Sequence, residues 1–117
     1  MALDVTDACL VEGLSDKGYM MYEKKGGRTT GHASWWGQIE TMIACVNAWQ
    51  ISGNDVYLQS ADTVWTFVKD CMIDREYGEW YSDCFDGEGK KDTPKVSMWR
   101  CPYHTVRLGV EIHNRLK

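Results

Sequence analysis

Two runs of apolar residues at helical spacing, separated by a very short connection, constrain this chain more than any other feature. The first run spans 35–52 and ends at Gly53. The second spans 56–72, and Asn54-Asp55 are residue types that cap a helix start. Because so few residues join the two runs, the spacing predicts two helices packed as an antiparallel hairpin.

Shorter patterns predict how the rest of the chain is organised. In chain order they are a helix over 3–12, a strand over 19–22 entering a turn at 23–27, a loop over 28–34, a strand-like segment over 79–85, a turn at 86–89, a loop over 90–98 and a last helix over 103–116. Helix hairpins thus alternate with loops that contain short strand pieces. Long loops at one end of a helical layer are a usual place for a ligand site.

The length and charge of the chain exclude several classes of protein. A chain of 117 residues has room for one small domain. The net charge of −4 has the wrong sign for a surface that neutralises phosphates, so nucleic acid is not an expected partner. No apolar run approaches the roughly 20 residues that a membrane span needs, and the N-terminus lacks the pattern of a signal peptide. These features predict a soluble, cytoplasmic protein with no membrane partner.

The cysteines support the same location. The chain has five of them, an odd number at irregular spacings, and Cys9, Cys45 and Cys71 fall inside predicted helices. A free thiol in a helix behaves as a small apolar side chain. We therefore expect reduced cysteines in a reducing compartment.

Tryptophan and tyrosine are unusually frequent, with six of each. Trp36 opens one predicted helix and Trp99 precedes another, so both lie at loop ends. Flat indole faces stack on the C–H face of sugar rings, and polar neighbours can bind the hydroxyl groups. The alternative is that Trp36 is simply the first residue of a buried stripe.

The last predicted helix carries a possible catalytic group. His104 lies in its first turn, and Arg107 and Glu111 follow at spacings that share one face. The positive end of the helix dipole disfavours an imidazolium, which would keep His104 neutral and able to act as a base near pH 7. The alternative is a histidine that only hydrogen-bonds a loop.

Glu40 lies on the apolar side of the helix over 35–52, one turn after Trp36. A carboxylate on an apolar stripe needs a partner, so Glu40 is expected either to form a salt bridge or to bind a ligand.

No metal or cofactor is expected. Cys101 and His104 form one Cys-x-x-His pair, but a zinc site needs four ligands and no second close pair exists. The glycine pairs at 26–27 and 87–89 have the composition of turns and not of a phosphate-binding loop.

Three segments together resemble the N-acylglucosamine 2-epimerase family, and within it the cellobiose and mannobiose 2-epimerases. They are Trp35-Trp36-Gly37-Gln38-Ile39-Glu40, Asp74-Arg75-Glu76-Tyr77-Gly78-Glu79-Trp80-Tyr81, and the run 94–107 with Trp99 followed by Pro102-Tyr103-His104 and Arg107. The likeness covers nearly the whole chain in the right order. Gly37 and Thr105 stand where the family often has Pro and Asn, which bears on substrate preference.

The resemblance implies a fold and a site. Members of the family are all-α (α/α)6 barrels, so residues 1–117 would form the C-terminal third of such a barrel, with antiparallel helix hairpins and short β-hairpin loops. His104 matches one of two catalytic histidines that exchange the C2 proton of the reducing-end sugar through an enediolate. Trp36 and Trp99 would line the sugar site and Glu23 would be a further contact, and Glu40 and Arg107 are also candidates for substrate binding.

These expectations favour a C-terminal segment of a sugar 2-epimerase acting on a mono- or disaccharide without a cofactor. The second catalytic histidine of the family lies upstream of the matched segments, so the isolated chain is expected to be inactive. An open barrel would expose apolar helix faces and favour self-association. The alternatives are a carbohydrate-binding remnant without catalysis and a purely structural helical module.

Overall fold

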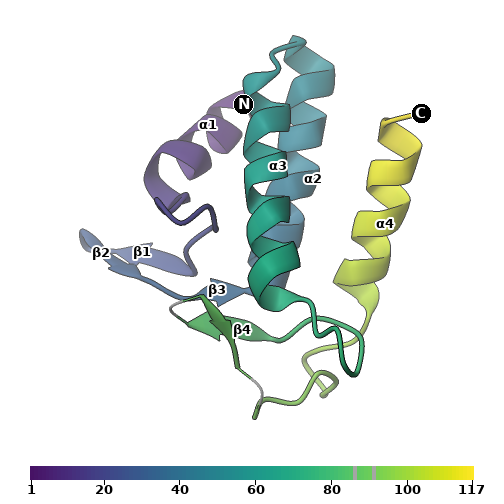
Figure 1. Cartoon of the computed structure of the whole chain (residues 1–117). Coiled ribbons are helices and arrows are strands. Elements are labelled where there is room, and N and C mark those ends of the chain that lie inside the picture. Colours follow the sequence, from purple (N-terminus) through teal and green to yellow (C-terminus); the bar gives the residue numbers. More distant parts are fainter. Residues whose placement is uncertain (86, 91) are drawn as a thin grey trace.

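A helix hairpin at the centre of the molecule confirms the main sequence prediction. A computed structural model describes residues 1–85, 87–90 and 92–117. In it α2 (Trp35–Ser52) and α3 (Val56–Phe67) run antiparallel, side by side (Figure 1), and α3 continues into a π-helical turn, η1 (Val68–Met72). Gly53 ends α2 because it adopts a left-handed φ of 69° and donates its N–H to the Trp49 carbonyl at 2.7 Å.

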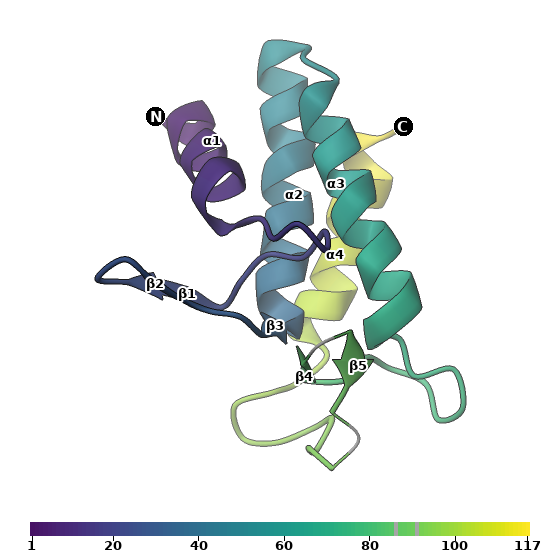
Figure 2. The ribbon, with the colours of Figure 1, turned by 60° about the vertical axis from the view of Figure 1, so that its left-hand side comes forward.

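The two remaining α-helices of the described chain flank α2. α1 (Ala2–Gly13) and α4 (Tyr103–Arg115) both contact α2, on different sides of it (Figures 1 and 2). α2 and α4 begin at the same end of the molecule, where the long loops and the small strands gather. Both helix N-termini therefore face the loop end, and their dipoles make it locally positive.

Two small antiparallel sheets lie at this loop end. β1 (Glu23–Lys25) pairs with β2 (Arg28–Thr30), and β3 (Ala33–Ser34), β4 (Asp83–Phe85) and β5 (Glu88–Gly89) form the second sheet. The β1–β2 hairpin projects beyond the helices (Figure 2). The strand-like composition of 79–85 thus corresponds to β4.

Two strand predictions are wrong. The strand lies at Glu23–Lys25 and not at 19–22. The turn is confined to Gly26 and Gly27, which take positive φ values of 56° and 76°, so residues 23–25 are free to pair with 28–30. The predicted loop over 28–34 contains β2 and β3, since β3 pairs with the distant β4. In the turn predicted at 86–89, Asp86 lies outside the described residues, as does Lys91 of the predicted loop over 90–98.

The core lies between α2, α3 and the second sheet. Its buried apolar side chains include Ile39, Met42, Ile43, Val64, Val68, Met72 and Cys84. Trp36, for which the alternative prediction is a place at the start of a buried stripe, keeps 40% of its surface exposed.

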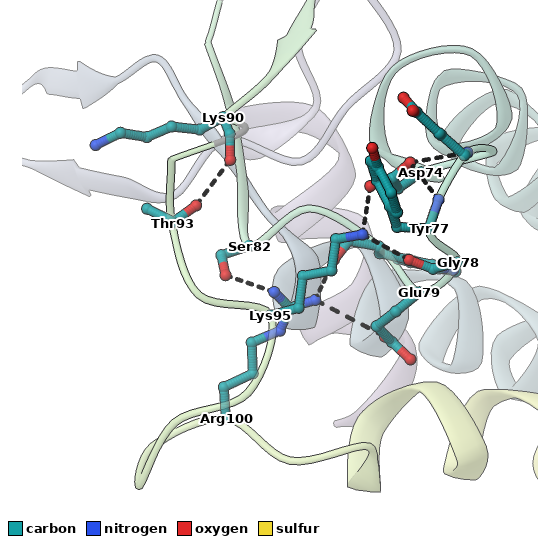
Figure 3. A network of polar contacts seen from close by, with 11 residues as sticks. Asp74, Tyr77, Gly78, Glu79, Ser82, Lys90, Thr93, Lys95 and Arg100 are labelled. Carbon is teal, nitrogen blue, oxygen red and sulfur yellow. Dashed lines mark hydrogen bonds and ion pairs between the residues drawn. The ribbon is translucent and has the colours of Figure 1, made fainter.

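The segment between η1 and α4 is fixed by two charged side chains (Figure 3). Arg100, only 4% exposed, donates to the Ser82 hydroxyl and the Trp80 carbonyl, and its guanidinium lies 4.8 Å from the centre of the Trp35 ring. Lys95 pairs with the Asp74 carboxylate and donates to the Gly78 carbonyl at 2.7 Å. These contacts order a long loop that has little regular structure of its own.

All five cysteine thiols are free in this structure. In the part of the chain that the structure describes, no helix has both the length and the apolar content needed to cross a bilayer.

Candidate functional site

The candidate site is built around His104 in the first turn of α4. Pro102 precedes the helix and fixes its start, and the backbone N–H of Val106 closes the first turn on the Pro102 carbonyl at 2.9 Å. His104 Nδ1 lies 2.9 Å from Glu40 Oε1. Because a carboxylate only accepts, Nδ1 carries the proton and the lone pair of the neutral ring is on Nε2. That tautomer is the one a general base needs.

Glu40 is in turn held by Arg107. Arg107 Nη1 donates to Glu40 Oε1 at 2.6 Å and also contacts Oε2. Partial burial of the Glu40 carboxyl works against its ionisation, but the hydrogen bonds from Arg107 and His104 outweigh this and lower its pKa. The predicted need of Glu40 for a partner is confirmed, and its partners are both residues of the α4 face.

His104 shares an open hollow with the two indoles that the sequence singled out. The hollow has a volume of about 590 Å³ and is lined by Tyr22, His32, Ser34, Trp35, Trp36, Asp83, Trp99 and His104. Trp99 is 86% exposed, so it forms a wall at the rim. The chain therefore brings Trp36, Trp99 and His104 together, and their roles toward a ligand stay predictions.

The other predicted contact residues lie elsewhere. Glu23 is exposed on β1, where it pairs with Thr30, and it does not line the hollow. Glu40 lines a neighbouring cavity of about 270 Å³, and Arg107 lies behind Glu40. Glu40 and Arg107 therefore do not line the hollow themselves. Glu40 contacts His104, which does, and Arg107 contacts Glu40.

Sequence reasoning missed two ionisable residues of the hollow, His32 and Asp83. His32 Nε2 lies 3.6 Å from Asp83 Oδ1, beside the β3–β4 pairing. No local sequence pattern predicts this contact, because about fifty residues separate His32 and Asp83 in the chain. Elsewhere among residues 1–85, 87–90 and 92–117, no group of three His, Cys, Asp or Glu side chains is arranged to hold a metal.

Comparison with known proteins gives consistent relatives. The profile of the family described as N-acylglucosamine 2-epimerase (GlcNAc 2-epimerase) matches residues 1–107. The chain is 37% identical over 110 residues to a cellobiose 2-epimerase from Bacteroides fragilis, which is 90% of this chain and 28% of that protein. It is 42% identical over 83 residues to a cellobiose 2-epimerase from Ruminococcus albus, covering 69% of this chain and 21% of the relative.

Solved structures superpose on nearly the whole chain. A sugar epimerase from a ruminal bacterium matches with a TM-score of 0.90 and 33% identity, over 97% of this chain and 29% of that structure. The cellobiose 2-epimerase from Bacillus thermoamylovorans matches with a TM-score of 0.90 and 32% identity, again over 97% and 29%. The chain therefore spans less than a third of the length of these relatives.

Proposed function

Because this chain belongs to the N-acylglucosamine 2-epimerase family, we propose that it provides one half of the active site of a carbohydrate 2-epimerase. The observation that carries the proposal is the contact of His104 with Glu40 at the wall of a hollow that Trp36 and Trp99 also line. The proposed substrate is a mono- or disaccharide with a free reducing end. No cofactor is needed, since the reaction is a proton exchange.

In the proposed step His104 removes the proton at C2 of the ring-opened sugar. The proton next to an aldehyde carbon is weakly acidic, so its removal needs a placed base and a polar site for the enediolate oxygens. Nε2 takes the proton, and the Glu40 carboxylate stabilises the imidazolium that forms. Return of a proton to the opposite face of C2 gives the epimer.

The opposite face requires a second base. Relatives are more than three times as long as this chain, and we propose that the remainder of an (α/α)6 barrel supplies that group. Residues 1–117 alone would then be inactive in epimerisation.

A chimera tests this proposal. Residues 1–117 replace the matching 28% of the Bacteroides fragilis relative, and conversion of cellobiose to its C2 epimer is measured. We expect activity that His104→Ala lowers by about 10²-fold or more. His113→Ala is the matched control, since His113 lies on the same helix but outside the hollow. A folded chimera with equal activity before and after His104→Ala would overturn the assignment.

The non-catalytic alternative, carbohydrate binding without epimerisation, is tested by titrating the isolated chain with cellobiose and following tryptophan fluorescence. Carbohydrate binding predicts a saturable change that Trp36→Phe weakens. Trp65→Phe is the control, because its exposure is similar (37% against 40%) but it lines a different cavity. Binding together with an inactive, folded chimera would favour the alternative.

A further inference from the structure

His32 is held more firmly than its place in a loop requires. Its ring lies between those of Tyr22, with centroids 4.5 Å apart and planes 22° apart, and Phe85, at 5.0 Å and 19°. The backbone N–H of Tyr22 also donates to the His32 carbonyl at 3.0 Å. With both faces covered, the ring can offer only its edge, where the two nitrogens lie.

One of these nitrogens lies near a carboxylate. Nε2 faces Asp83 Oδ1 at 3.6 Å, and β3 pairs with β4 so that Ser34 stands opposite Asp83. At this distance the two groups form an ion pair when His32 is protonated, and not a hydrogen bond such as the 2.9 Å contact of His104 with Glu40.

The other nitrogen has no partner within the described part of the chain. None of the hydrogen bonds there involves His32 Nδ1, and no buried side-chain nitrogen there lacks a partner. The His32 side chain is 17% exposed and lines the same hollow as His104. If the ring served only to pack between Tyr22 and Phe85, a phenyl ring would stabilise the fold as well as an imidazole does.

The surroundings match a sugar more than another ligand. The ring centroids of Trp36 and Tyr22 lie 6.4 Å apart in an edge-to-face arrangement, and Tyr22 stacks on His32. The apolar ring faces of Trp36 and Tyr22 therefore lie next to the polar edge of the His32 ring. A sugar ring has the same alternation, with a C–H face and a rim of hydroxyl groups.

We infer that His32 is a saccharide-binding residue, whose Nδ1 hydrogen-bonds a sugar hydroxyl within the hollow that His104 also lines. The inference deepens the proposed function and rests on it. His32 has no part in the proton exchange: it positions the sugar, and the rings of Tyr22 and Phe85 hold His32 in place.

The test uses the full 117-residue chain, His32→Phe and His113→Phe. Phenylalanine keeps a planar ring between Tyr22 and Phe85 and removes both nitrogens. Cellobiose is titrated and tryptophan fluorescence is followed, with circular dichroism to verify folding. His32→Phe should raise Kd by about three- to tenfold, the effect of one neutral hydrogen bond, and His113→Phe should leave it unchanged.

The outcomes are distinct. If the unmodified chain shows no saturable binding of cellobiose, the inference is overturned, whereas the proposed function is decided by the chimera. If it binds and a folded His32→Phe variant binds equally well, the inference alone is overturned.

A second measurement applies if His32→Phe does not fold. The chain has only three histidines, so the ring nitrogen resonances of His32 in the unmodified chain can be assigned by elimination with His104 and His113 variants. Cellobiose should shift the Nδ1 resonance of His32, and an unchanged resonance at saturating cellobiose contradicts the inference.

Discussion

Glu40 Oε1 and His104 Nδ1 lie 2.9 Å apart although 64 residues separate them in the chain. The contact joins the second turn of α2 to the first turn of α4, near the loop end of the molecule. The contact sets the tautomer of the imidazole, and Glu40 also accepts a hydrogen bond from Arg107. The predicted base therefore has a carboxylate that orients it.

Glu40→Gln tests this relationship in the chimera. A neutral amide binds an imidazolium less well than a carboxylate does, so kcat should fall by about 10²-fold. KM should change by less than about twofold, because Glu40 does not line the hollow that holds the proposed sugar. Glu111→Gln is the control, since Glu111 pairs with Arg115 farther along α4. A large rise in KM with kcat unchanged would instead make Glu40 a substrate contact.

Arg100→Ala should destabilise the chain. Arg100 is buried, and its loss leaves the Trp80 carbonyl without its donor and the Trp35 ring without its stacked guanidinium. We expect the free energy of unfolding to fall by about 2–4 kcal/mol in urea titrations. The exposed Arg75, which donates to the Lys69 carbonyl, provides the control, and Arg75→Ala should cost less than about 1 kcal/mol. Equal losses for the two variants would refute the role of Arg100.

Asp74 predicts a dependence of stability on pH. The hydrogen bond from Lys95, helped by the backbone N–H groups of Tyr77 and Glu76, lowers the pKa of Asp74 from 3.8 to about 2. The unfolded chain then binds the proton first, so this stabilisation is present above pH 3.8 and is lost as the pH falls toward about 2.

Thermal unfolding measured between pH 5 and pH 2 checks this dependence. Asp74→Asn should lower Tm at pH 5 and flatten the decline of Tm toward pH 2. Asp70→Asn, on the neighbouring η1, should follow the unmodified chain. An unchanged slope for Asp74→Asn would contradict the prediction.

Self-association remains a prediction, and the structure suggests where to test it. A mainly apolar groove of about 610 Å³ lies between α2, α3 and α4. Leu116 lines this groove and Val110 does not, although their exposed fractions are 52% and 53%. If the groove is the contact, Leu116→Glu should lower the average mass in light scattering at high concentration, whereas Val110→Glu should not. A monomer at every concentration would refute self-association.

Most of the helical framework could be predicted because its signals are local. The apolar spacing of 35–52 and 56–72, with Gly53 and Asn54 between them, defines a hairpin without reference to the rest of the chain. The strands could not be placed in the same way. β3 has only two residues, and it exists because β4 pairs with it from a distant part of the sequence.

The candidate site also combines features that local sequence predicts with contacts that only the fold creates. The sequence by itself determined that His104 opens a helix behind Pro102, that Glu40 needs a partner, and that indoles stand at loop ends. Only the tertiary structure decided that the partners of Glu40 are His104 and Arg107, that Glu23 lies outside the hollow, and that His32 and Asp83 lie within it. Helix starts depend on residues that are neighbours in the sequence. These contacts instead join residues that are far apart in the sequence and become neighbours only in the folded chain.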